Sequence, residues 1–195
     1  MALSNCGPVK SAARSWNQIP GLFKLMSIAE LQQKLITRHQ DFTDRILGIP
    51  QARLVQADPG KWNAIQLMDH IRISVKPVRL ALQLPKFVLR VFGKANRPSR
   101  SYEALVERYQ TKLREGGKAP GRFVPSAQSA SPERIARELI DLVKGLSQSL
   151  ESFTETELDT YLLPHPLLGK LTLREMIYFT IYHVGHHEQQ LKPIA

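Results

Sequence analysis

Three of the six histidines in this 195-residue chain fall within five residues near the C-terminus, at positions 183, 186 and 187. On a helix, His183 and His187 are one turn apart, so their side chains project from the same side. Two imidazoles at this spacing can bind one metal ion. The alternative is a pair of core histidines, each hydrogen-bonded to a polar partner. A third ligand from elsewhere in the chain would favour the metal site.

The helix that carries this pair is predicted over residues 172–191. Thr172 and Glu175 have the spacing of a capping box at its start. At about 100° per residue around the helix, His187 lies about 40° and His183 about 80° from the centre of an apolar stripe, which predicts that both side chains point inward. His186 lies about 140° away and is expected to face outward. The stripe consists of Leu173, Met176, Ile177, Thr180, Val184 and Leu191.

Three further helices are predicted at 27–47, 63–83 and 131–153, from capping residues that precede apolar stripes. His70 lies on the second of these helices, beside its apolar positions, and can reach a bundle interior. Pro77 and Pro85 are expected to kink or end that helix. Four amphipathic helices without a strand pattern predict an all-α, four-helix bundle. Its interior is expected to be lined by Leu67, Ile71, Ile177 and Val184.

A long, loop-rich connection links the second and third helices. Residues 92–130 are rich in Gly and Pro, with a short helix expected at about 102–113. Ten basic and three acidic residues lie between positions 84 and 124, in a chain of net charge +10. This charge indicates either a solvated basic surface or attraction for an anionic small molecule. The region lacks a recognised nucleic-acid motif, so a nucleic-acid partner is not expected.

Composition limits the class of protein further. The single Cys6 excludes an intramolecular disulfide and fits a reducing compartment, so a cytoplasmic location is expected. No apolar run approaches the roughly 18 residues of a membrane span. Residues 1–25, which are basic and interrupted by Gly and Pro, are predicted to be a disordered or loosely packed extension. The helical domain is predicted to cover 26–195.

Three further features stand out along the chain. They are Lys61-Trp62-Asn63 before Asp69-His70-Ile71, the segment from Pro120 to Pro125, and His165-Pro166-Leu167-Leu168-Gly169-Lys170-Leu171-Thr172 before His183-x-x-His186-His187-x-x-Gln190-Leu191. These motifs resemble those of the DinB-like superfamily, whose members include bacterial thiol S-transferases and proteins described as metal-dependent hydrolases. The resemblance covers residues 26–193 and implies a DinB-type bundle, a homodimer, and a divalent metal bound by His70, His183 and His187 with water in an open position.

Three neutral imidazoles suit zinc or nickel, and also iron or manganese. Such an ion can activate a thiol or a water for attack on a small electrophilic substrate, which predicts a thiol S-transferase with a low-molecular-weight thiol, or a hydrolase. The alternative is a non-catalytic bundle with a structural or vestigial metal site. No general base is evident: Asp69 should point elsewhere, and Glu188 is at most a carboxylate that orients His187. The remaining histidines are expected on a helix surface, His39, and in a loop, His165.

Overall fold

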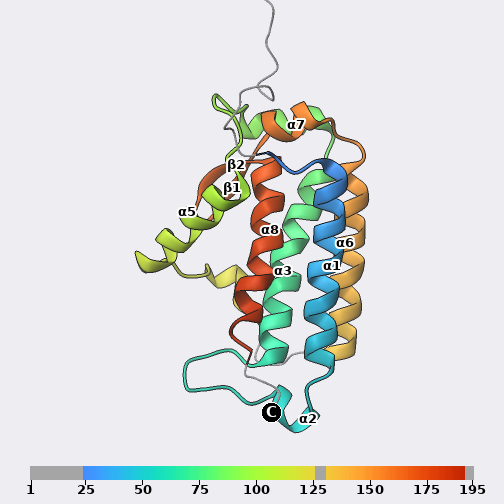
Figure 1. Ribbon diagram of the computed structural model, residues 1–195, viewed down its shortest axis with the longest axis vertical. Helices are drawn as coiled ribbons and strands as arrows, with labels where there is room; N and C mark the ends of the chain where they lie inside the picture. The colour runs from blue at the N-terminus through green and yellow to red at the C-terminus, as the bar shows by residue number, and fades with distance from the viewer. Residues whose placement is uncertain (1–23, 126–130, 192–195) are drawn as a thin grey trace, which may run out of the picture.

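The computed structural model describes residues 24–125 and 131–191, and it is mostly helical (Figure 1). Four long helices run side by side: α1 (Ile28–Leu47), α3 (Ala64–Leu82), α6 (Pro132–Leu150) and α8 (Leu173–Glu188). Helix α3 packs on α6, α6 on α1 and α1 on α8, while α3 also contacts α8. Each lies within a few residues of its predicted range. The contact between α3 and α8 places the helix of His70 against the helix of His183 and His187.

Shorter elements connect the long helices. They are α2 (Gln51–Leu54), α4 (Lys86–Leu89), the 3-10 helix η2 (Arg90–Phe92), α5 (Tyr102–Arg114), the 3-10 helix η3 (Gly121–Phe123) and α7 (Glu155–Thr160). Helix α5 corresponds to the helix expected at about 102–113 within the loop-rich connection of residues 92–130, called the basic connection from here on. It crosses the outer side of α8 at an angle (Figure 1), so the connection covers one face of that helix.

The predicted helix starts are present as capping boxes. The side chains of Ser27, Asn63 and Thr172 each accept a hydrogen bond from the backbone N–H three residues on, and the third residue bonds back. These bonds satisfy N–H groups that have no partner within the helix. Pro77 lies inside α3, which continues to Leu82 and ends before Pro85.

A small two-stranded sheet was not predicted. Strand β1 (Leu162–His165) pairs antiparallel with β2 (Gly169–Thr172), and His165 lies opposite Gly169 at the turn. Gly169 has a φ of 73°, a left-handed conformation that glycine adopts without strain. Four residues per strand are too few for an alternating pattern to stand out in a sequence. The hairpin leads directly into α8 and fixes its first residue.

The expectation that His39 lies on a helix surface is wrong, since its side chain is fully buried. Helix α1 packs on both α6 and α8, so two of its sides are covered and His39 lies in line with Leu35 and Phe42. Its Nδ1 lies 2.7 Å from the carbonyl oxygen of Leu35. Of the predicted extension, residues 1–25, positions 1–23 lie outside the described residues. Among the described helices, none is long and apolar enough to cross a membrane.

Candidate metal centre

The structure brings together the three histidines that the sequence proposed as ligands. His70 comes from the second turn of α3, and His183 and His187 come from the last two turns of α8. The Nε2 atom of His183 lies 3.2 Å from Nε2 of His70 and 3.1 Å from Nε2 of His187. One nitrogen from each ring lies within 4.8 Å of the others. The relative exposures of the three residues are only 3%, 7% and 6%, so protein shields the cluster from water on most sides.

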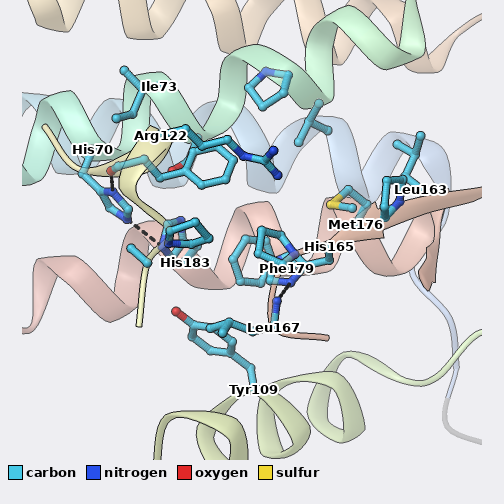
Figure 2. A pocket seen from close by; sticks show the side chains of 18 of the residues that line it. His70, Ile73, Tyr109, Arg122, Leu163, His165, Leu167, Met176, Phe179 and His183 are labelled. Carbon is cyan, nitrogen blue, oxygen red and sulfur yellow. Dashed lines mark hydrogen bonds between the residues drawn. The ribbon is translucent and has the colours of Figure 1, made fainter. Parts of the chain in front are cut away.

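A backbone carbonyl fixes the orientation of His70. Its Nδ1 lies 2.6 Å from the carbonyl oxygen of Phe123, as a dashed line in Figure 2 shows. A carbonyl only accepts, so Nδ1 carries the hydrogen and the neutral ring has a lone pair at Nε2. Metal-binding histidines are commonly held in this way, with the far nitrogen donating to a carbonyl. The carbonyl belongs to η3, within the basic connection, which therefore contributes to the site.

Burial keeps these imidazoles neutral. It lowers the pKa of His183 well below the ordinary 6.5, lowers that of His187 to about 3, and also lowers that of His70. Desolvation acts in this direction because it penalises the charged imidazolium. Neutral rings are the form that a metal ion requires.

The donor set fits a divalent ion. A single hydrogen on Nε2 of His183 cannot lie on the lines to both neighbouring nitrogens, so the cluster cannot satisfy itself by hydrogen bonds alone. Three nitrogens at the ligand distance of about 2.0–2.1 Å from one ion would be separated by about the spacings seen here. The geometry therefore suits three imidazole ligands with further coordination positions left open.

Aromatic rings surround the cluster. The Trp62 ring centroid lies 4.7 Å from that of His70 and 6.2 Å from that of His187. Phe179 stacks on His183 at 4.8 Å with 24° between the ring planes. Trp62 belongs to the Lys61-Trp62-Asn63 motif that precedes His70, whereas no sequence pattern linked Phe179 with the histidines.

A cavity of about 610 Å³ adjoins the three histidines. Leu67, Ile71, Ile177 and Val184, which were expected to line the bundle interior, are buried in the core with 0–1% exposure and do not border this cavity. The basic connection supplies part of the lining. The lining residues are Trp62, His70, Ile73, Ser74, Pro77, Val78, Ala81, Phe92, Tyr109, Leu113, Ala119, Pro120, Arg122, Phe123, Leu163, Pro164, His165, Pro166, Leu167, Met176, Phe179, His183, His186 and His187.

The other polar candidates lie outside the cluster. His186 is half-buried with its ring near those of Tyr109, Tyr182 and His187, but it is not part of the group of three converging nitrogens. Asp69 points away and pairs with Arg72 on its own helix. Glu188 does not orient His187, because its carboxylate pairs with two arginines of α1. Nδ1 of His187 is buried without a hydrogen-bond partner among the described residues.

Comparisons with known proteins agree with the motifs. The uncharacterized protein YuaE of Bacillus subtilis (strain 168) is 32% identical over 77 residues, which cover 40% of this chain and 47% of that protein. The chain thus spans about half the length of this curated relative. No solved structure matches the chain. A family model described as the DinB superfamily matches residues 12–191, nearly the whole sequence. The chain therefore belongs to the DinB superfamily.

Proposed function

We propose that this protein is a metal-dependent enzyme with the four-helix bundle of the DinB type, in which His70, His183 and His187 hold a divalent ion. Zinc or nickel suits three neutral imidazoles best, and iron or manganese can also bind such ligands. The observation that carries the proposal is the convergence of three Nε2 atoms at the wall of a large cavity. A homodimer and a cytoplasmic location belong to the proposal, the first through family resemblance and the second through the single cysteine.

An open site supports catalysis rather than a structural role. Structural zinc sites are normally closed by four protein ligands, whereas catalytic ones keep a position for water or substrate. Among the described residues, the group able to hold a metal ion contains three side chains, with no carboxylate or thiol beside them. The cluster also borders a cavity of 610 Å³, within the size range of small-molecule sites.

A bound divalent ion would supply a Lewis acid that lowers the pKa of a neighbouring thiol or water. The chain's own residues orient and desolvate the reacting groups. The carbonyl of Phe123 holds the ring of His70, while Trp62 and Phe179 cover the sides of the cluster. Excluding water in this way strengthens electrostatic interactions within the site.

The cavity favours thiol transfer over hydrolysis. Metal-dependent hydrolases commonly use a carboxylate as general base beside the water. Among the residues that the structure describes, no Asp or Glu lines this cavity. A thiol whose proton is lost on binding needs no such base. We therefore favour a thiol S-transferase that uses a low-molecular-weight thiol and a small electrophilic substrate. The alternative is a non-catalytic bundle with a structural or vestigial metal site.

The experiment uses protein purified without a histidine tag. Metal content is measured for the wild type and for His183→Ala, His187→Ala and His186→Ala, the last being a neighbouring histidine outside the cluster. We expect one metal ion per chain in the wild type and in His186→Ala, and none in the other two. The proteins are then loaded with zinc, nickel, manganese or iron and assayed with a bromobimane and several low-molecular-weight thiols.

Metal-dependent turnover that disappears in His183→Ala would support the enzyme. Stoichiometric metal without an exchangeable ligand, and without turnover, would support the structural alternative. Metal loss in His186→Ala, with metal kept in His187→Ala, would contradict the assignment of ligands.

A further inference from the structure

We propose that the cavity beside the three histidines binds a bulky, uncharged apolar compound with a hydrogen-bond-accepting oxygen, and that His165 donates its Nε2–H to that oxygen. The proposal rests on the proposed function only in identifying this compound with the electrophilic substrate. Binding itself requires the cavity and His165, not a metal ion.

The lining of the cavity indicates an uncharged apolar ligand. Most lining residues are aliphatic, aromatic or proline, and among the described residues they include neither a carboxylate nor a lysine. A cationic ligand would therefore lose water without gaining a counter-charge. Arg122, the one charged residue among the described residues of the lining, is exposed, and its guanidinium lies 5.0 Å from the centre of the Phe123 ring. The volume admits a molecule of two or three rings.

The hydrogen of His165 has a fixed position. Its Nδ1 accepts hydrogen bonds from the backbone N–H groups of Leu167 and Leu168, at 3.2 and 3.1 Å. An accepting Nδ1 has no hydrogen, so the neutral ring carries its hydrogen on Nε2. Burial lowers the pKa of His165 to about 4, so the ring stays neutral near pH 7. The turn between β1 and β2 therefore fixes the direction in which His165 can donate a hydrogen bond.

The Nε2–H group of His165 is available to a ligand and is not used in a hydrogen bond within the described protein. The ring of His165 lines the cavity and meets the ring of Phe179 edge-on at 4.2 Å. Within the described residues, no protein atom forms a hydrogen bond with its Nε2. This nitrogen is also not fully buried. Nε2 is therefore exposed to solvent on a ring that lines the cavity, and no described protein atom uses its hydrogen.

The arrangement also sets the length of the ligand. Phe179 lies between His183 and His165 (Figure 2), with ring centroids 4.8 Å from the first and 4.2 Å from the second. A compound that reaches from the three histidines to His165 must pass along Phe179. Its accepting oxygen is then several atoms away from the part beside the metal centre. His165 is thus a binding residue that selects substrates.

Tyr109 carries a second donor in the cavity, but it is placed differently. Its ring lies 6.3 Å from that of His183, and burial raises its pKa to about 12, so the hydroxyl stays protonated. A hydroxyl hydrogen rotates about its bond, whereas the hydrogen of His165 is fixed by the ring. A pre-organised donor loses less freedom on binding and gives more selectivity. This difference makes His165 the residue to test, with Tyr109 as the comparison.

The test uses two probes of similar shape. Chalcone is an apolar α,β-unsaturated ketone, and 1,3-diphenylpropene lacks its carbonyl oxygen. Binding to metal-free protein is measured by equilibrium dialysis, with thermal unfolding recorded for each variant. The wild type should bind chalcone about three- to tenfold more tightly, as expected for one hydrogen bond. Equal binding of the two probes, or binding of neither, would overturn the proposal without the use of any variant.

Three variants locate the interaction. In His165→Asn the side-chain oxygen can still accept from Leu167 and Leu168, but the shorter amide places its N–H groups away from the position of Nε2–H, so the preference for chalcone should disappear. Tyr109→Phe should keep it. Ala81→Phe, which narrows the cavity about three helical turns along α3 from His70, should weaken both probes at least tenfold. Loss of the preference in Tyr109→Phe, with its retention in His165→Asn, would contradict the role of His165.

Metal content of the same samples separates the two proposals. Protein that binds metal but shows no preference for chalcone would refute this inference and leave the metal-dependent function standing. Protein that prefers chalcone but binds no metal at pH 7 would support this inference and refute the proposed function.

Discussion

The burial of the three histidines predicts that metal affinity depends only weakly on pH. Protons and metal ions compete for the same Nε2 lone pairs, so a lower imidazole pKa weakens the competition. An ordinary histidine of pKa 6.5 is about three-quarters neutral at pH 7.0 and about one-tenth neutral at pH 5.5. Three such ligands would together lose roughly 600-fold in affinity over this range.

The structure predicts a much smaller loss. Burial lowers the pKa of His187 to about 3, that of His183 well below 6.5, and that of His70 in the same direction. With most of the proton competition removed, we expect zinc affinity to fall by less than about tenfold, the loss that one ordinary imidazole would give. The direction is fixed by the sign of the shifts: affinity is retained as the pH falls.

Equilibrium dialysis against zinc at pH 7.0, 6.25 and 5.5, with metal measured by mass spectrometry, tests this prediction. Circular dichroism at each pH establishes that the protein stays folded. An unfolded peptide with three histidines provides the control and should show the full loss of several hundredfold. A loss above a hundredfold in the folded protein would refute the reasoning, because the imidazoles would then titrate as if exposed to water.

Three further predictions concern stability. His39 is fully buried, and desolvation lowers its pKa to about 4, so the unfolded state binds a proton at higher pH than the folded state does and stability falls from pH 6.5 towards pH 4. In urea unfolding at pH 7 and 4.5, His39→Leu should lose roughly 2–3 kcal/mol less stability than the wild type between the two pH values. Equal losses in both proteins would contradict this prediction. A Cβ at Gly145 would lie 2.5 Å from Nε of Arg79, a buried atom that has little room to move, so Gly145→Ala should destabilise by about 1–3 kcal/mol. Gly185→Ala is the matched control: its Cβ meets the flexible end of an arginine, and the net change in thermal stability should stay within about 1 kcal/mol. Glu175 has no exposed surface and pairs with two arginines of the basic connection, so Glu175→Gln should cost about 3 kcal/mol in urea unfolding, and a change below about 1 kcal/mol would show that the pairs are dispensable.

The sequence alone was enough to predict the long helices and the pairing of His183 with His187. Capping residues such as Thr172 act through bonds to neighbours three residues away, and helical periodicity places His183 and His187 on one side of α8. Both signals are local, so they can be read without knowledge of the tertiary structure. The choice of His70 as third partner came through family resemblance, because nothing in the chain's local pattern links positions 113 residues apart.

Tertiary packing decided the surroundings of the cluster. His39 was misplaced because the sequence does not show that α1 is covered on two sides. His165 was treated as a loop residue, although the short hairpin and Phe179 bring it to the cavity wall. The carbonyl of Phe123 that orients His70 belongs to a backbone group, which every residue possesses and no sequence motif marks. Helix positions follow from short-range bonds, whereas a cavity, a buried imidazole and a carbonyl partner depend on which segments meet in space.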